Sequence, residues 1–496
     1  MKKRWFSFLL TLLLILTACG NAETPEETAQ TSEAAPIEVP EEETEETDAR
    51  NIKDDVPQLD FGSGSFRSIG QSSGNKDIYA AEETGEALND AIYIRNRSVE
   101  ERLNIVIEPM EEIWYTDLSS KIHQCVLGGD DAYELILGQM EQSGADSQEG
   151  IFRNWYDVPY TDFSKPWYPK SVTDRSASIN GKMYIVVSDM LITFASNTWA
   201  VVFDKVRAAD FGLGNLYDTV YAGEWTLDYL LGLSDSVYTD TNGDGNRDRD
   251  DLYAFTSASG DGCLMASFLY GSEVRFAEIR DDHVVMTLNN DKSVSVFEKL
   301  HRLFYESQGV WDTNSAYSVT DGVVTNLLLT QFTEGKTVFA NSTVGSIGSG
   351  LRDYENDYGV LPIPKYDASQ TEYYTVTDAG CNIMAVSVIA AQLDMIGAVT
   401  ECLAAESFRS VMPTYYDITL AAKGVRDVES SEMMDYVLRS RQLDFAYMYD
   451  GWNGWVFHSS EFISQAGQFA SVYKKYEKLT QKYYDKVLAF FNEPEP

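Results

Sequence analysis

The sequence predicts an α/β fold, because short β-rich runs alternate with helical periods and the chain is long enough for large cores. Strands are expected at 66–69, 104–108 and 133–137, with amphipathic helices between them at 85–103 and 118–127. Strands and helices that alternate in this way form a parallel sheet with right-handed crossovers. At 496 residues, the chain has room for two or three domains.

The later part of the chain continues the same mixture of segments. We expect further strands at 182–188, 199–203, 337–341, 358–362 and 383–388, and further helices at 225–233, 293–307, 390–404 and 469–491. In the last helix, lysines alternate with Tyr, Leu and Val at helical spacing, which indicates a surface helix.

One polar side chain is placed directly by the predicted sheet. Ligands of parallel sheets bind beyond the carboxyl ends of the strands. Gly138, Gln139 and Met140 follow the strand at 133–137, so we expect Gln139 near a binding site.

The composition describes a globular and strongly acidic protein. Hydrophobic residues make up 44% of the chain, and its formal net charge is −40. This charge argues against nucleic acid as a partner, because nucleic-acid binders need basic patches to displace counterions. It also favours neutral ligands over anionic ones.

The N-terminal segment 1–19 has the pattern of an export signal. Three basic residues at 2–4 precede an apolar run at 5–16 that is short for a bilayer span. Leu16-Thr17-Ala18-Cys19-Gly20 resembles the lipobox of bacterial lipoprotein precursors, which implies cleavage before Cys19 and acylation of its thiol. The alternatives are an ordinary signal peptide or a membrane helix. The resemblance implies an extracytoplasmic protein held on the cell membrane, on the outer face of a Gram-positive cell.

The segment 20–58 is expected to be a disordered tether. It is dominated by Glu, Thr, Pro and Ala, whose like charges repel each other and whose apolar surface is too small to offset chain entropy. We expect folding to begin near Leu59.

Four cysteines remain after Cys19: Cys125, Cys263, Cys381 and Cys402. Their spacing matches no zinc or redox motif. Two disulfides and four buried thiols are both compatible with this pattern.

Five segments resemble a known family. The family is that of sugar-type (family 1) extracellular solute-binding proteins, the lipoprotein receptors of bacterial ABC importers. The segments are 89–101 (NDAIYIRNRSVEE), 331–337 (QFTEGKT), 359–367 (GVLPIPKYD), 413–417 (PTYYD) and 423–427 (KGVRD).

The resemblance implies a type II periplasmic-binding-protein-like fold, with two lobes, a ligand in the cleft between them and closure on binding. Lobe 1 would comprise 59–190 with 380–430, and lobe 2 would comprise 191–379 with 431–496. The chain would cross between lobes near 188–198, near 378–382 and around Ser430. The implied partners are a sugar, the permease subunits and, through the anchor, the membrane, with the receptor itself a monomer.

Sugar recognition needs flat apolar faces together with carboxylates and amides for paired hydroxyls. Trp452 and Trp455 offer two indoles flanked by Gly, Asp and Asn, although each is equally compatible with a core position. By the resemblance, Asp189 and Asn341 follow strands where related receptors place ligand contacts, and Cys381 and Asn382 stand at the second crossing.

The segment 240–251 resembles a calcium-binding loop. Its oxygen-bearing positions are Asp240, Asn242, Asp244, Asn246, Asp248 and Asp251, with Gly245 at the sixth position, where a sharp turn is required. Asp251 stands where the pattern has Glu, and the shorter side chain weakens the expected site. The alternative is a polar surface turn without metal.

Enzyme signatures are weak. The four histidines are scattered, and the chain has no HExxH, GxSxG, GxGxxG or P-loop motif. A glycosidase needs only two carboxylates, so a lipid-anchored glycosidase remains one alternative, and an adhesin or structural lipoprotein is another. The sequence therefore predicts a non-enzymatic, lipid-anchored receptor for a sugar or oligosaccharide, with no catalytic cofactor and with calcium as a structural ion.

Overall fold

The computed structural model describes residues 49–493 apart from 174–176, 282, 322, 422–427, 450–453, 455 and 457. Asp48–Pro496 form one compact unit. No helix in the described part of the chain is both long and apolar enough to cross a membrane. Cys19, Trp452 and Trp455 lie outside the described residues.

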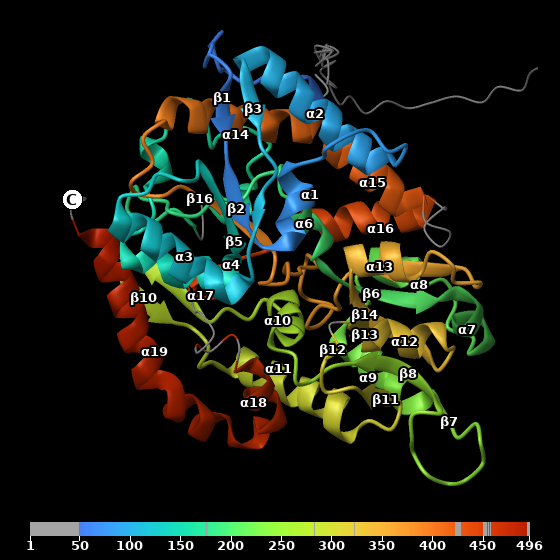
Figure 1. The fold of residues 1–496 in the computed structure, drawn as a ribbon. Helices are drawn as coiled ribbons and strands as arrows, with labels where there is room; N and C mark the ends of the chain where they lie inside the picture. Colours follow the sequence, from blue (N-terminus) through green and yellow to red (C-terminus); the bar gives the residue numbers. More distant parts are fainter. Residues whose placement is uncertain are drawn as a thin grey trace, which may run out of the picture. The chain divides into compact units, whose positions relative to one another are not determined.

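The first lobe is built around a four-stranded sheet in the order β16-β5-β2-β4. Its strands are β2 (Ser68–Gly70), β4 (Glu111–Glu112), β5 (Leu135–Gln139) and β16 (Asn382–Ala385). β2 runs parallel to β4 and β5, as predicted, and β16 runs antiparallel to β5. Figure 1 shows α2 (Ala87–Leu103), α3 (Tyr115–Gly128) and α14 (Leu393–Glu406) around this sheet.

The strand expected at 66–69 is in fact two strands that pair with different partners. β1 (Gly64–Phe66) pairs in parallel with β3 (Ile105–Ile107), whereas β2 pairs with β5. The break falls at Arg67, whose backbone N–H donates to the Glu134 carboxylate at 2.6 Å instead of to a neighbouring strand.

The second lobe is built around a mixed sheet in the order β11-β8-β14-β6-β15, with β7 paired to β8. Its strands are β6 (Trp199–Asp204), β7 (Tyr238–Thr239), β8 (Leu252–Ser257), β11 (Val310–Asp312), β14 (Thr337–Thr343) and β15 (Tyr358–Leu361). β6 runs antiparallel to both of its neighbours, β14 and β15. The helices α7 (Lys205–Asp210), α9 (Leu227–Ser236), α12 (Leu327–Thr333) and α13 (Val344–Gly350) pack against these strands or beside them (Figure 1).

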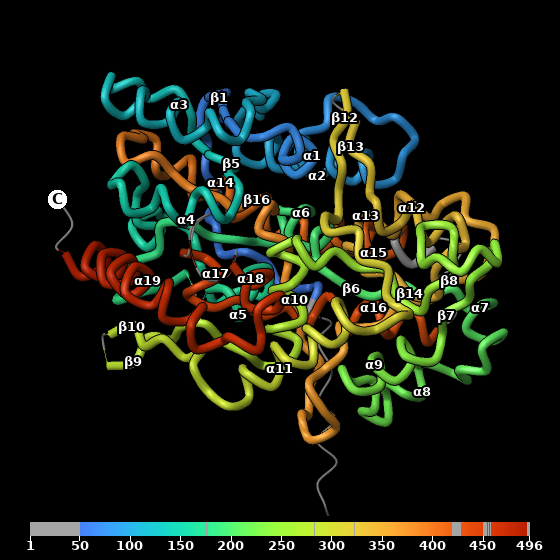
Figure 2. Tube along the Cα trace, turned by 90° about the horizontal axis from the view of Figure 1, so that it is seen from below, coloured from blue at the N-terminus to red at the C-terminus, as the bar shows by residue number. Residues whose placement is uncertain are grey.

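The described residues also form two β-hairpins: β9 (Ala277–Arg280) with β10 (His283–Met286), and β12 (Tyr317–Thr320) with β13 (Val323–Asn326). Figure 2 shows the hairpin β12–β13 projecting from the rest of its lobe. The remaining α-helices are α1 (Asn75–Ile78), α4 (Met140–Asp146), α5 (Lys170–Val172), α6 (Ile192–Ser196), α8 (Leu216–Tyr221), α10 (Gly262–Gly271), α11 (Asp291–His301), α15 (Met412–Ala421), α16 (Val428–Arg439), α17 (Phe445–Tyr449), α18 (Ser459–Ser464) and α19 (Phe469–Asn492).

The chain crosses between the two sheets through segments that lie side by side. The first crossing contains α6 and leads into β6, and the second connects β15 to β16. They join through an antiparallel bridge between Thr198 and Thr377. A third segment joins them at Arg441, which forms a parallel bridge with Thr375.

The third crossing was expected around Ser430, which instead lies within α16. Ser430 is buried there and hydrogen bonds to the hydroxyl of Tyr217 in the second lobe. The third segment pairs with the second crossing just after α16 ends. There the Thr375 N–H donates to the Ser440 carbonyl, and the Gln442 N–H donates to the Thr375 carbonyl.

Two further expectations differ from the structure. The segment 182–188 forms no strand and has only isolated bridges, such as that between Val186 and Met384 of the short strand β16. The tether was expected to reach residue 58, but Asp54 forms a 2.7 Å ion pair with Arg102 of α2, and Val56 is only 7% exposed. The folded part therefore begins before Leu59.

The four cysteines that follow Cys19 are free thiols in this structure. Cys125, Cys381 and Cys402 are buried, and Cys263 is half-buried. Of the two arrangements that their spacing allows, the structure therefore has separate thiols and no disulfide among these four residues.

Candidate functional site

A cavity of about 440 Å³, which we call the interlobe cavity, is lined by both lobes and by the crossing segments. Its walls include α1, α2 and α15, together with α6, the β12 strand and the β14–α13 junction. Such a position, between lobes and beyond strand ends, is typical of ligand sites in α/β proteins. The lining residues are Lys76, Leu88, Ile192, Thr193, Ser196, Asn197, Tyr317, Thr343, Gly345, Ser346, Ser349, Asp378 and Tyr415.

The β14–α13 junction is shaped by one threonine and one glycine. Thr343 ends β14 and caps α13, because its hydroxyl accepts from the Ser346 N–H and donates to the Ser346 hydroxyl at 3.0 Å. A side chain at Gly345 would meet the Ser196 Cβ at 2.9 Å. Glycine therefore allows α13 to approach α6 closely enough to form one wall of the cavity.

Asp378 brings a carboxylate from the second crossing into the interlobe cavity. Its backbone N–H donates to the Asn197 carbonyl at 2.8 Å, and its side chain accepts from the Gly380 N–H at 2.9 Å. Burial, followed by the negative charge of Asp261, raises the pKa of Asp378 to about 7. Near neutral pH this group can therefore donate a hydrogen bond as well as accept one.

Asp261 and Cys263 lie beside Asp378. One donor atom from each of the three lies within 4.8 Å of the others, and no other grouping of three such residues is this close among the described residues. Asp261 also caps α10 by accepting from the Leu264 N–H, and burial raises its pKa. Burial likewise raises the pKa of the Cys263 thiol, with smaller contributions from the charges of Asp378, Asp261 and Glu141 of α4. The cluster therefore gathers acidic groups from the start of α10 and from the second crossing.

Tyr317 contributes the aromatic surface of the interlobe cavity. It is the first residue of β12 and is half-buried. Burial raises its phenol pKa, whereas hydrogen bonds with Ser346 and Thr343 lower it. The side chain thus offers a flat ring and a protonated hydroxyl at one position, a combination suited to a sugar.

A buried carboxylate fixes the first lobe to the first crossing. Asp77 of α1 accepts from the Thr193 N–H at 3.1 Å, from the Thr193 hydroxyl at 2.7 Å and from the Asn382 amide at 2.9 Å. Burial raises the pKa of Asp77 to about 6, although these hydrogen bonds oppose the shift. This network positions α6, which carries Thr193 and Ser196 on the cavity wall.

Gln139, Cys381 and Asn382 lie together next to this network but do not line the interlobe cavity. The Gln139 amide donates to the Gln71 side chain at 3.1 Å, and its own carbonyl oxygen is buried without a hydrogen-bond partner. Asn382 is fully buried and accepts from the same Gln71 at 2.8 Å. Cys381 is also buried. Ligand contact by these three residues stays a prediction.

Asp189 and Asn341 are also placed away from the lining. Asn341 is fully buried within the second sheet, where its carbonyl oxygen accepts from the Ser257 hydroxyl at 2.8 Å. Asp189 lies on the first crossing, where burial raises its pKa to about 7 against the positive charge of Arg441. Their roles as ligand contacts likewise stay predictions.

The acidic loop 240–251 connects β7 to β8. The Asp240 carboxylate accepts from the Gly243 and Gly245 N–H groups, and Gly245 adopts the positive φ of +77° that a sharp turn requires. Asp251 is buried and accepts from the Tyr238 hydroxyl at 2.7 Å. The turn fits a calcium loop, but its described carboxylates do not bring three ligand atoms within 4.8 Å of one another. Calcium binding stays a prediction.

Most of the cavity lining lies in segments without periodic sequence patterns. Asn197, Asp378 and the Gly/Ser-rich α13 are in crossings or short helices, which hydrophobic periodicity does not identify. The sequence carries one signal for this lining: Asn341 ends the strand predicted at 337–341, and the observed strand continues for two residues to Thr343, which lines the cavity.

The fold is shared with solved structures of bacterial sugar receptors. The galacto-N-biose/lacto-N-biose I-binding protein of the ABC transporter from Bifidobacterium longum aligns with a TM-score of 0.54 at 11% identity, covering 87% of this chain and 98% of its own. The maltose-binding protein MalE from Listeria monocytogenes aligns with a TM-score of 0.52 at 15% identity, covering 86% and 97%. MalX from Streptococcus pneumoniae, solved with maltopentaose, gives 0.51 at 14% identity, covering 86% and 99%.

No protein-family model matches the chain, and no curated protein sequence matches it. The structural likeness nevertheless confirms the predicted two-lobed α/β fold, which these solved structures share. Among the structures that share this fold, the Bifidobacterium longum protein and an ABC substrate-binding protein from Listeria monocytogenes, solved with cycloalternan, are described as binding proteins of ABC systems, the class that the sequence resembles.

The buried carboxyls predict that stability falls as pH rises. The pKa values of Asp77, Asp189 and Asp378 are raised to about 6, 7 and 7, from about 4 in an unfolded chain. Between about pH 4 and 7 the folded protein therefore holds protons that the unfolded chain has released, so stability decreases across this window and levels off above it. We expect a Tm at least about 2 °C higher at pH 5.5 than at pH 8, by scanning calorimetry.

A matched pair of variants tests the origin of this slope. Asp189→Asn should reduce the pH dependence, because the amide carries no charge at either pH. Asp117→Asn, at an exposed position of α3, should leave the dependence unchanged. A wild-type Tm that is equal or higher at pH 8 would contradict the assignment.

Proposed function

We propose that this protein is a substrate-binding receptor that captures a sugar or oligosaccharide between its lobes and delivers it to an ABC permease. The observation that carries the proposal is the interlobe cavity, to which both lobes and the crossings contribute side chains. A ligand that contacts both lobes favours their closed arrangement. A permease can then distinguish the closed, loaded receptor from the open, empty one.

The chemistry of the cavity supports a neutral polyhydroxyl ligand. Tyr317 and Tyr415 supply aromatic surface, and Thr193, Ser196 and Ser346 supply hydroxyl groups. Only Lys76 and Asp378 among the thirteen described lining residues are charged. Protein hydroxyls form hydrogen bonds with the hydroxyl groups of a sugar, and aromatic faces pack against its C–H surfaces. The structurally similar proteins solved with maltose, maltopentaose and lacto-N-biose also support a neutral sugar as the ligand.

The second candidate is a glycosidase, which the carboxyl pair Asp261 and Asp378 favours. One carboxylate oxygen of each lies within 4.8 Å of the other, and a glycosidase needs two neighbouring carboxyl groups. Calorimetric titration with oligosaccharides, followed by product analysis, separates the two functions. The receptor predicts saturable one-to-one binding with intact ligand, and release of new reducing ends would support the glycosidase instead. Failure to bind any soluble saccharide would support an adhesin.

Tyr317→Ala should weaken sugar binding by roughly tenfold or more, about 1.4 kcal/mol, because it removes the aromatic ring from the cavity. The measurement is calorimetric titration with whichever sugar binds the wild type. Tyr221→Ala is the matched control, since Tyr221 is 53% exposed on α8 and lines neither this cavity nor its neighbours. Equal affinities of wild type and Tyr317→Ala would contradict the placement of the site.

The proposal includes a lipid anchor at Cys19 and an acidic tether on the extracytoplasmic face of the membrane. The lipobox-like sequence supports the anchor, and confinement near the permease would raise the effective concentration of loaded receptor. Cys19→Ala should move the protein from the membrane fraction to the medium while leaving its ligand affinity unchanged. Retention of the variant on membranes would refute the anchor.

We further propose that the loop 240–251 binds Ca²⁺ as a structural ion, while ligand binding needs no cofactor. Asp240, Asn242, Asp244 and Asp248 supply oxygen ligands, and the Asn246 carbonyl supplies another. A bound ion stabilises the folded state by mass action, so a calcium chelator should lower the Tm. Asp240→Asn together with Asp244→Asn should remove this sensitivity. A wild-type Tm that is unchanged by the chelator would argue against calcium.

A further inference from the structure

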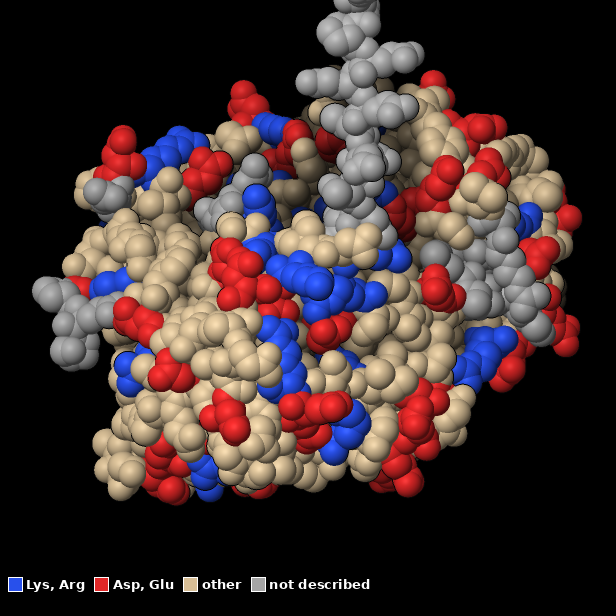
Figure 3. Space-filling view, turned by 90° about the horizontal axis from the view of Figure 1, so that it is seen from above, with Lys and Arg blue, Asp and Glu red and all other residues tan. Residues whose placement is uncertain are grey.

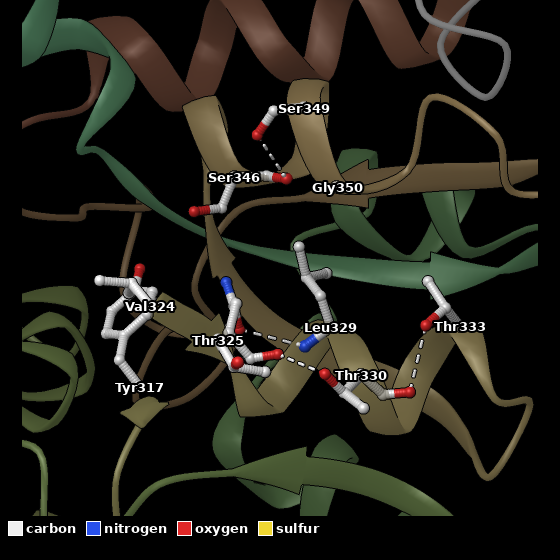
Figure 4. A pocket seen from close by; sticks show the side chains of 10 residues that line it. Tyr317, Val324, Thr325, Leu329, Thr330, Thr333, Ser346, Ser349 and Gly350 are labelled. Atoms are coloured by element: carbon white, nitrogen blue, oxygen red, sulfur yellow. Dashed lines mark hydrogen bonds between the residues drawn. The ribbon is translucent and has the colours of Figure 1, made fainter. Parts of the chain in front are cut away.

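We propose that the ligand is a linear, neutral oligosaccharide that extends from the interlobe cavity into a second cavity beneath the β12–β13 hairpin. This second cavity, which we call the hairpin groove, has a volume of about 440 Å³ and lies between the hairpin, α12 and α13. Figure 4 shows Ser346 and Ser349 of α13 along one side, with Thr325, Leu329 and Thr330 opposite. The inference rests on the proposed function and specifies the class of sugar.

The two cavities are neighbours. Tyr317, Ser346 and Ser349 line both the interlobe cavity and the hairpin groove. A chain of sugar units that fills the first cavity can therefore continue past Tyr317 into the second. The two volumes together, about 880 Å³ as a simple sum of 440 and 440, are close to the upper range of about 1,000 Å³ for small-ligand sites.

The hairpin groove selects against charge. None of the ten described residues that line it is acidic or basic, although 23% of the whole chain is charged. Figure 3 shows how widely acidic and basic side chains cover another view of the surface. A charged sugar would lose its hydration in the groove without gaining an ionic partner.

The hydroxyls of the groove are arranged to accept hydrogen bonds. Thr330 donates to the Asn326 carbonyl at 2.8 Å, Thr333 donates to the Thr330 carbonyl at 3.2 Å, and Ser349 donates to the Gly345 carbonyl at 2.9 Å. Because each hydroxyl has one proton, these oxygens retain only acceptor capacity for a ligand. The groove therefore fits a molecule with many hydroxyl donors and no charge.

The hairpin also presents apolar surface that a ligand would cover. Val324 lines the groove and is 64% exposed. Sugar rings combine hydroxyl edges with C–H faces, so one unit can bond to the threonine and serine oxygens while it covers this valine. A single short sugar held in the interlobe cavity would leave the groove unused.

The test measures affinity against chain length. Ladders of two to five units of neutral α-glucan, β-glucan, β-xylan and β-mannan are titrated calorimetrically against the full mature chain, with oligogalacturonates as an acidic comparison. For the neutral series that binds, we expect affinity to rise at least tenfold from two to five units. We expect oligogalacturonates not to bind.

Two substitutions with the same chemistry locate the effect. Thr325→Glu places a carboxylate in the groove, whereas Thr320→Glu places one on the same hairpin outside both cavities. Thr325→Glu should reduce the affinity for the five-unit ligand to that for the two-unit ligand and leave the two-unit affinity unchanged. Thr320→Glu should behave like the wild type.

The outcomes separate the two levels of the argument. Equal affinities across all lengths, or a Thr325→Glu variant that still gains affinity with length, would overturn the hairpin groove but leave the receptor function intact. Absence of binding to every neutral and acidic ladder would overturn both.

Discussion

The backbone pairing between the first and second crossings is the constraint on which the site depends. Thr198 and Thr377 form an antiparallel bridge, the Trp199 N–H donates to the Val376 carbonyl, and the Asp378 N–H donates to the Asn197 carbonyl. This register fixes where β6 begins relative to β16. It consequently brings the end of the first sheet, the start of the second and the Asp378 carboxylate to one place. A shift of register by one residue would turn the Asp378 side chain to the opposite side of the crossing segment.

Electrostatics at this meeting point differs from the average of the chain. The chain carries a net charge of −40, yet the groups at the lobe junction are buried carboxyls with raised pKa values, and the adjoining groove has no charged lining. Protons bound by such carboxyls limit the repulsion that two neighbouring acids would otherwise produce. An acidic exterior is thus compatible with a binding region that is nearly neutral.

Elements of both lobes were predictable where they are long or strongly patterned. The helix at 85–103 is found as α2, since Ile92, Val99 and Leu103 form a buried stripe. The strand at 199–203 is found as β6, whose six residues are all buried. The segment 182–188 was less predictable. It has the apolar composition of a strand, but it pairs with the short strand β16 at only one residue.

The Asp321-Gly322 dipeptide between β-rich runs was a readable hairpin signal. The interlobe cavity was not predictable, because register and crossings bring its lining together from distant parts of the chain.

The most direct measurement of the central claim is a crystal structure of the protein grown with a saturating neutral oligosaccharide. The account predicts electron density for the sugar in the interlobe cavity, with Tyr317 against a ring face, Asp378 within hydrogen-bond distance of a hydroxyl and further units running along α13. Sugar bound elsewhere on the molecule, with this cavity occupied only by solvent, would contradict the account.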